Sequence, residues 1–349
     1  DNMAYSDIKP SEHFNTVIYS GNSDTSRSLT GVGFQPDFVW IKKRNASERH
    51  LLTSNQMSTD SGAYKWIDCS DTAAQFSGGT GVASFDTDGV TFKASDATWN
   101  ASSSTYVIWN WLANGGTTSS NTDGDVTSTV QVNQDAGFSI ITDGPHANTN
   151  ARSIGHGLGK KPTFIIRFNT TRIENKPVFF QGFGTTGGMS IDGEGTNHTS
   201  TTHIFTGVTS TTFGVGTDFR INGNYPFVTW CFTDIQGYSK SGVYKGNGNV
   251  NGPFLYTGFK PAWVIIKANS NYKYWNIHDN KRDTTNPNTA RLAPSLQNAE
   301  DQVTGLDFLS NGFKVRDSGS TINESGTTIS YMAFAEHPFV AGGVPTTAG

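Results

Sequence analysis

The stretch TGVGFQPDFVWIKKRN, from Thr30 to Asn45, decides the fold because the chain repeats it twice. A second copy, GHGLGKKPTFIIRFN, covers Gly155 to Asn169, and a third, YTGFKPAWVIIKAN, covers Tyr256 to Asn269. Each copy has a turn with glycine, one proline and an apolar run. Proline lacks an N–H and therefore suits the entry to a strand. Because the apolar runs do not alternate, we expect strands that are covered on both faces.

Each copy also closes on a similar strand, which follows a polar turn that begins with asparagine. The closing segments start at Asn100, Asn222 and Asn323. Large side chains alternate along them, so one face of each strand is predicted to form a recurring core wall. The residues on that face are Val107, Trp109 and Trp111, then Val228, Trp230 and Phe232, then Ser330, Met332 and Phe334.

Two matched hairpins support the repeat. FDTDGVTF (Phe85 to Phe92) and FLSNGFKV (Phe308 to Val315) contain Asp-Gly and Asn-Gly turns, which favour tight antiparallel hairpins. The middle copy lacks a clear equivalent, so we expect it to be the most diverged. Helical pattern is scarce, and its best example, Leu296 to Gln302, is too short to be stable alone.

The composition agrees with a β-rich protein. Charged residues make up only 15% of the chain and aromatic residues 12%, and there are 39 glycines, as short strands joined by tight turns require. The net charge of −4 provides no basic field for nucleic acid or an anionic membrane. No apolar run approaches the length of a membrane span. We therefore expect no nucleic-acid or membrane partner.

The spacing of the repeats, roughly one hundred residues, is that of domains rather than of a solenoid. We predict an all-β chain of three tandem β-sandwich domains with little helix, of jelly-roll or concanavalin-like topology. The first domain is predicted over residues 1–115, the diverged second over 127–238 and the third over 239–349. Residues 116–126, rich in Gly, Ser, Thr and Asn, are predicted to be a flexible linker.

The chain offers little that is typical of an enzyme. Cys69 and Cys231 are too few for a disulfide framework or a zinc site. His156 occupies a turn position where the first copy has valine, which indicates a structural role. We expect no catalytic residues, no bound cofactor and no enzymatic activity. The acidic residues available for hydrolysis have no spacing that pairs them, and they are Glu174, Asp192, Glu194, Glu300 and Asp301.

Two short segments resemble parts of calcium loops. Asp86 to Gly89 and Asn121 to Asp125 place carboxylates two residues apart, as calcium loops do. Both lack the remaining ligands of an EF-hand. An ordinary turn is the preferred interpretation, with a calcium ion as the alternative.

The residues also resemble a known family. IKPSEHFNTVIYSGN (Ile8 to Asn22), followed by the first repeated stretch, is similar to the opening of repeat-containing structural proteins of marine bacteriophages, notably those that infect cyanobacteria. WNIHDNKRDTTNPNTARLAPSLQNAED (Trp275 to Asp301) and LDFLSNGFKV (Leu306 to Val315) resemble the closing repeat of the same family. The resemblance implies a virion surface protein with jelly-roll or concanavalin-like sandwiches, and it brings no catalytic residues.

Three functions follow as hypotheses. In the first, the chain is a tail fibre or receptor-binding protein whose sandwich loops contact host-surface glycans. In the second, it is a capsid decoration or head-fibre protein that attaches to other virion proteins, and in the third it is a glycan depolymerase. A homo-oligomer is expected, because symmetric assembly multiplies weak contacts. Four aromatic residues are candidates for stacking on sugars, with burial in the core or in domain junctions as the alternative, and they are Trp99, Tyr272, Tyr274 and Trp275.

Overall fold

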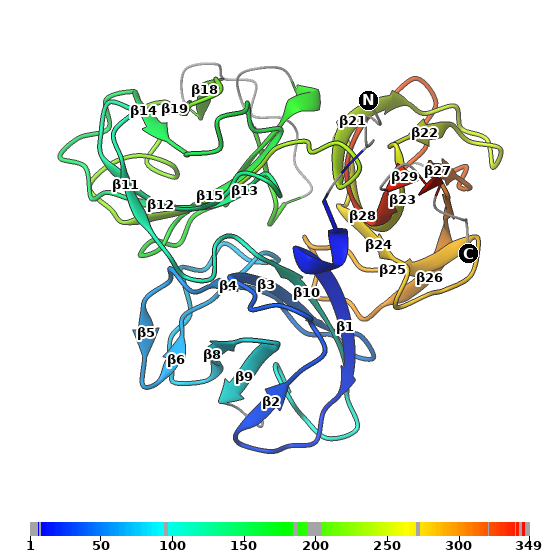
Figure 1. Ribbon diagram of the computed structural model, residues 1–349, viewed down its shortest axis with the longest axis horizontal. Coiled ribbons are helices and arrows are strands. Elements are labelled where there is room, and N and C mark those ends of the chain that lie inside the picture. The colour runs from blue at the N-terminus through cyan, green and yellow to red at the C-terminus, as the bar shows by residue number, and fades with distance from the viewer. Residues whose placement is uncertain are drawn as a thin grey trace.

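The structure is a computed structural model that describes residue 6 and residues 8–93, 97–183, 188–193, 204–269, 273–319, 321–338, 340–341 and 344–345. Strands dominate these residues, and the helical segments among them are two short 3-10 turns, η1 (Pro10–Glu12) and η2 (Gln181–Phe183). The strands form three β-sandwich units arranged around a common centre (Figure 1). The predicted all-β fold with three sandwiches is confirmed.

Strand β3 (Phe38–Lys43) shows how the repeated stretch folds. Phe38 and Trp40 join one buried cluster, whereas Val39 and Ile41 join another, because successive side chains on a strand point to opposite faces. The unbroken apolar run therefore marks a strand that is covered on both sides, as the sequence predicts.

The first unit packs a five-stranded antiparallel sheet, in the order β1-β10-β3-β4-β7, against a three-stranded sheet, β2-β9-β8. A small hairpin, β5 with β6, lies beside them. Its strands besides β3 are β1 (Phe14–Ser20), β2 (Arg27–Leu29), β4 (His50–Ser54), β5 (Thr59–Asp60), β6 (Ala63–Tyr64), β7 (Ile67–Asp68), β8 (Gly81–Asp86), β9 (Gly89–Lys93) and β10 (Thr105–Trp111).

The second unit has a seven-stranded sheet, β11-β12-β13-β20-β15-β16-β17, and a three-stranded sheet, β14-β19-β18. The bounds are β11 (Ser119–Asn121), β12 (Ser128–Asn133), β13 (Phe138–Asp143), β14 (Arg152–Gly155), β15 (Phe164–Asn169), β16 (Pro177–Phe180), β17 (Met189–Ser190), β18 (Phe205–Val208), β19 (Thr212–Val215) and β20 (Phe227–Phe232). Residues 116–126, predicted to be a linker, include β11, which pairs with β12 and so belongs to this sheet.

The third unit has two four-stranded sheets, β21-β28-β23-β24 and β22-β27-β26-β25. The bounds are β21 (Ser239–Lys245), β22 (Phe254–Tyr256), β23 (Phe259–Ala268), β24 (Asn276–Asp279), β25 (Asn288–Arg291), β26 (Asp301–Leu309), β27 (Gly312–Val315) and β28 (Thr328–Pro338), with a further hairpin of β29 (Val340–Ala341) and β30 (Val344–Pro345). The best helical pattern in the sequence, Leu296 to Gln302, forms no helix: residues 296–300 are irregular, and Asp301 and Gln302 begin β26.

The strand orders reveal that the three units are copies of one arrangement. The series β1-β10-β3-β4, β13-β20-β15-β16 and β21-β28-β23-β24 match strand for strand, as do β2-β9-β8, β14-β19-β18 and β22-β27-β26. The hairpins predicted at Phe85–Phe92 and Phe308–Val315 are β8–β9 and β26–β27. The middle copy does have the equivalent, β18–β19. The pattern missed it because its turn, at Thr209–Thr211, contains no glycine.

Four hydrophobic clusters hold the molecule together. Three of them lie between the two sheets of a single unit. The fourth and largest contains side chains from the sheets that hold β10, β20 and β28, one sheet of each unit, including Trp40, Trp230 and Trp263. The sandwiches therefore share one central core, and the repeats are not arranged end to end.

The central core is organised around three equivalent residues. Trp111, Phe232 and Phe334 occupy matching positions on β10, β20 and β28, and their ring centroids are 6.1, 5.7 and 5.9 Å apart, pair by pair. This near-equilateral triangle marks a pseudo-threefold axis along the strands. The predicted core wall is confirmed, and it faces the other two units rather than the opposite sheet of its own sandwich.

Candidate functional site

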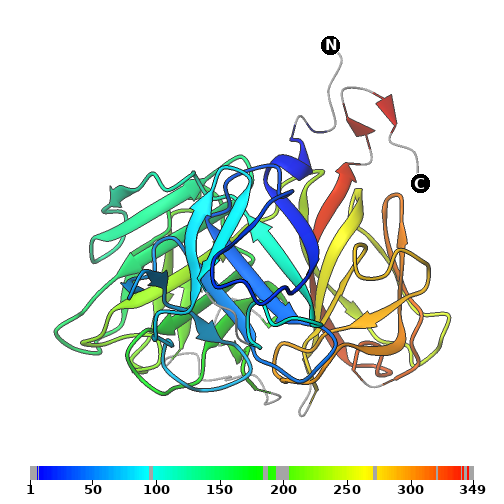
Figure 2. The ribbon, with the colours of Figure 1, turned by 90° about the horizontal axis from the view of Figure 1, so that it is seen from below.

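The two ends of this body differ. Strand β1 starts, and β28 stops, at the same end of the molecule (Figure 2). The first residue of each of β1, β13 and β21 pairs with a member of the axial triangle, and each of these strands runs away from that end. The pairs are Phe14 with Trp111, Phe138 with Phe232 and Ser239 with Phe334. The loops that follow these strands therefore all lie at the opposite end, and they are residues 21–26, 144–151 and 246–253. We call them the end loops.

A buried asparagine clamps each end loop. Asn100 is fully buried, and its Nδ2 donates to Asn22 Oδ1 at 2.7 Å and to the Asp24 carbonyl at 3.0 Å. Its Oδ1 accepts from the Asn22 N–H and from Arg27 Nη1. An amide offers two donors and an acceptor at one point, so a single side chain holds both sides of the loop.

The other two units repeat the clamp with equivalent residues. Asn222 Nδ2 donates to the carbonyls of Thr149, Asn150 and Gly216 at 3.3, 2.9 and 2.7 Å. Asn323 Nδ2 donates to Asn247 Oδ1 at 2.9 Å and to the Asn249 carbonyl at 2.8 Å. These asparagines are the ones that open the closing segments in the sequence. The repeat therefore encodes three preorganised loops as well as three core walls.

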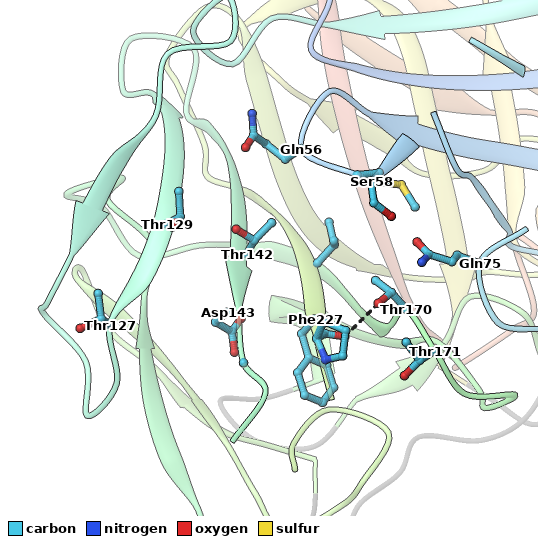
Figure 3. Close-up of a pocket in the computed structure, with 14 residues that line it drawn as sticks. Gln56, Ser58, Gln75, Thr127, Thr129, Thr142, Asp143, Thr170, Thr171 and Phe227 are labelled. Carbon is cyan, nitrogen blue, oxygen red and sulfur yellow. Dashed lines mark hydrogen bonds between the residues drawn. The ribbon is translucent and has the colours of Figure 1, made fainter. Parts of the chain in front are cut away.

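A polar cleft lies between the first and second units, at the start of the second end loop (Figure 3). Its volume is about 470 Å³. The first unit contributes Gln56 and Gln75, and the second contributes threonines from β12 and β13 together with an apolar floor at Phe227. The labelled threonines in Figure 3 are Thr127, Thr129, Thr142, Thr170 and Thr171. Neutral hydroxyl and amide groups over an apolar floor suit a neutral, hydroxylated ligand.

Among the described residues that line this cleft, Asp143 supplies the one carboxylate, and it is already engaged. Both of its oxygens accept from the guanidinium of Arg167, at 2.6 and 2.7 Å, and Oδ2 also contacts His146 Nε2 at 2.8 Å. Burial alone would raise the pKa of Asp143, but the charge and hydrogen bonds of Arg167 outweigh it and lower that pKa. Asp143 therefore stays ionised as part of a buried ion pair inside the second unit.

The units are locked to each other by polar contacts around the central core. Glu300 of the third unit accepts from Arg44 of the first at 2.8 and 2.9 Å and from its neighbour Arg282 at 3.0 Å. Between the first and second units, Lys176 Nζ donates to the carbonyls of Asp71 and Ala73. Because these groups are largely buried, the relative positions of the end loops are fixed.

Two of the four predicted sugar-stacking residues are core residues. Trp99 and Trp275 are fully buried, in the core of the first unit and in the central core respectively, so the alternative of a core role is correct for both. Trp275 Nε1 also donates to the Ser190 carbonyl at 3.0 Å, which joins the third unit to the second. Tyr274 is half-buried, and Tyr272 lies outside the described residues.

The acidic residues of the sequence survey are engaged in ion pairs or hydrogen bonds. Glu174 pairs with Arg172 at 3.2 Å, and Asp301 pairs with Arg291. Asp192 accepts from the backbone N–H of Lys176 at 3.0 Å, and burial raises the pKa of Asp192. Glu194 lies outside the described residues. The described members of this set therefore take part in local contacts.

Asp86 and Asp125, from the segments that resemble calcium loops, accept hydrogen bonds from serine and threonine groups. Asp86 accepts from the hydroxyls of Ser84 and Thr91, and Asp125 accepts from the N–H and hydroxyl of Ser153. Within the described ranges, no three His, Cys, Asp or Glu side chains gather as metal ligands would.

Both cysteines are buried and unpaired, and burial raises the pKa of each thiol. A buried cysteine of this kind behaves as a small hydrophobe. His156 is also buried; its Nδ1 accepts from the Leu158 N–H at 3.1 Å. These contacts hold a turn, in agreement with the structural role expected from the repeat position.

Comparison with known proteins finds a match over nearly the whole described chain. The family described as Domain of unknown function (DUF7483) matches residues 9–338. No curated protein matches the chain. Among the helical segments that the structure describes, none is long and apolar enough to cross a membrane.

Proposed function

The chain belongs to the DUF7483 family, and we propose that it is a surface component of a bacteriophage virion, of the tail-fibre or receptor-binding type. In this role it is a display protein that contacts host-surface glycans through the loops of its sandwiches. The observation that carries the proposal is the set of three end loops. Each is clamped by a buried asparagine, and all lie at the end opposite to the one where β28 stops.

Rigid scaffolds with loops at one end are suited to recognition. Binding loses affinity when loops must become ordered, so loops that are already held by buried hydrogen bonds bind at lower entropic cost. Three loops on one body can also engage a repeating surface together, which raises the apparent affinity without new contacts. The shared core and the ion pair between Arg44 and Glu300 hold the units that carry the three loops in fixed relative positions.

A glycan is the ligand class that the local chemistry favours. The cleft beside the second end loop offers hydroxyl and amide groups, and its carboxylate is neutralised by Arg167. Such a lining can exchange hydrogen bonds with sugar hydroxyls while the floor at Phe227 covers an apolar sugar face. The sequence resemblance to structural proteins of marine phages supports the same assignment from an independent direction.

Capsid decoration is the second candidate function, and the pseudo-threefold axis favours it. A body whose central triangle is nearly equilateral has the shape to sit on a threefold position of a shell. In that case the end loops contact neighbouring capsid proteins instead of a host. A homo-oligomer remains a prediction under either function.

Immunogold labelling of intact particles with an antibody raised against this chain tests the proposal. Label at the tail or its appendages is the expected result. Label spread over the head supports decoration and excludes the fibre type. Absence of label from purified particles, with the same antibody positive against the isolated chain, overturns the virion assignment.

A further inference from the structure

The third unit exposes two aromatic side chains where the other units have small residues. On strand β22, Phe254 is 45% exposed and Tyr256 is 55% exposed, whereas Leu255 between them is buried. The two rings share the outer face of the sheet because they lie two residues apart on one strand. Strand β22 is the edge of its sheet (Figure 1).

The pseudo-symmetry shows that the fold does not need these rings. Leu255 pairs with Phe313, as Leu29 pairs with Val90 and Ile154 with Phe213. Phe254 is therefore equivalent to Ser28 and Ser153, and Tyr256 is equivalent to Thr30 and Gly155. Two sandwiches of the same chain form this strand with small residues, so the aromatic pair is a feature of the third unit alone.

The pair continues directly from the third end loop. Residues 247–251 are exposed, and the loop carries Val250, 59% exposed, among the amides of Asn247, Asn249 and Asn251. Lys314 pairs with Phe254 on the neighbouring strand β27, and its Nζ donates a hydrogen bond to the Gly252 carbonyl at 2.8 Å. This bond holds the loop against the strand. Aromatic faces and neutral amides thus lie on one continuous surface.

We propose that Phe254 and Tyr256 form a binding platform for a pyranose sugar. A pyranose presents C–H groups on one face, which pack against the negative face of an aromatic ring, and hydroxyls on its rim, which exchange hydrogen bonds with amides. This proposal rests on the proposed function, since it assigns a second glycan contact to the same display surface, separate from the cleft between the first and second units.

Other occupants fit this surface less well. A stable protein interface buries about 800 Å² on each partner, which three side chains do not supply. Pairing of an added strand along β22 is opposed by its length of three residues and by Pro253 at its start, since short edges and proline protect a sheet from such pairing. A single sugar or a disaccharide matches the size of the platform.

The test compares variants on an array of microbial polysaccharides, followed by titration of the best oligosaccharide. Phe254→Ser with Tyr256→Thr places the residues of the first unit on β22 and should therefore fold. We expect its affinity to fall about tenfold or more, since two ring contacts are lost. Val243→Ser, which removes another exposed apolar side chain of the same unit, is the matched control and should bind like the wild type.

A second pair of substitutions separates this proposal from the proposed function. Thr129→Val with Thr142→Val removes hydroxyls of the cleft and preserves the strands. If this variant loses glycan binding and the β22 variant does not, the platform is overturned and the glycan role of the cleft stands. If the wild type binds no glycan, or if the β22 variant loses self-association instead of glycan binding, the platform proposal is also overturned.

Discussion

Trp109 Nε1 donates a hydrogen bond to Asp279 Oδ2 at 3.0 Å, across 170 positions of sequence. Trp109 belongs to the first unit and Asp279 to the third, and both are fully buried. The same carboxylate oxygen accepts from Arg282 Nε, whose guanidinium carbon lies 5.6 Å from the centre of the Trp109 ring. One carboxylate thus ties together two sandwiches at the edge of the central core.

Removal of this carboxylate should destabilise the whole chain. Asp279→Asn keeps the shape but removes one of the two carboxylates that pair with the buried Arg282, so that Glu300 alone balances its charge. Loss of one member of a buried ion pair costs up to about 5 kcal/mol. Trp109→Phe, which removes a donor but no charge, is the comparison, although it also changes ring volume. Urea unfolding measures the free energy of unfolding of both variants and of the wild type. A loss below about 1 kcal/mol for Asp279→Asn would contradict the role assigned to the pair.

The axial triangle should control the cooperativity of unfolding. Phe334→Ala creates a cavity between all three units, and such truncations cost about 3–5 kcal/mol. Because the three units share this core, we expect tryptophan fluorescence and far-ultraviolet circular dichroism to report one transition at lower urea. Phe313→Ala, in the core of the third unit alone, is the control. A third unit that unfolds separately in wild-type protein would refute the shared core.

The asparagine clamps predict which of two substitutions at Asn222 destabilises the protein more. Asn222→Ala removes the amide donor from three carbonyl oxygens, of which that of Asn150 keeps Arg152 Nε as a donor. An unsatisfied buried acceptor costs about 1–3 kcal/mol. Asn222→Asp is nearly isosteric but places an acceptor against the same three carbonyls, so it should cost more. Chemical denaturation of the two variants gives the comparison. Equal stability of the aspartate variant and the wild type would show that the amide donors do not clamp the loop.

The buried His156 makes the free energy of unfolding depend on pH, in a direction that follows from its pKa. Burial lowers the pKa of His156 from 6.5 to about 4. Between these values the unfolded chain binds more protons than the folded chain, so the free energy of unfolding falls as the pH decreases from 6.5 towards 4. One such group contributes a slope of about 1.4 kcal/mol per pH unit.

His156→Gln removes this titration and keeps a polar side chain in the turn. Urea unfolding of the variant and of the wild type across pH 4 to 7 should therefore show a shallower pH dependence for the variant, by about one such slope. Identical pH profiles would mean that His156 does not fold in its neutral form.

The sequence predicts the local architecture better than the assembly. The repeated runs of β3, β15 and β23 indicate strands that are buried on both sides, and the alternation of Val107, Trp109 and Trp111 indicates a core wall. Neither pattern predicts what packs against this core wall, because the same residue types are buried by the opposite sheet of a sandwich and by a neighbouring unit. Tandem sandwiches and a closed body are therefore indistinguishable at this level.

The aromatic pair Phe254 and Tyr256 is not predicted from the sequence, for a related reason. Trp99 and Trp275 lie among polar residues in the sequence, but large rings in such segments can also fill a core. Phe254 and Tyr256 differ from them in one respect that the sequence does contain: the equivalent positions in the other copies are small and polar. An alignment of the three copies through Leu29, Ile154 and Leu255 would have found them.

Small-angle X-ray scattering of the intact chain tests the central claim, that three repeats close into one body. A single compact body of this length has a radius of gyration of about 20 Å, and this is the value that the shared core predicts. Three sandwiches of the same size in a linear array would give about 30 Å. The larger value would contradict both the common core and the joint presentation of the three end loops.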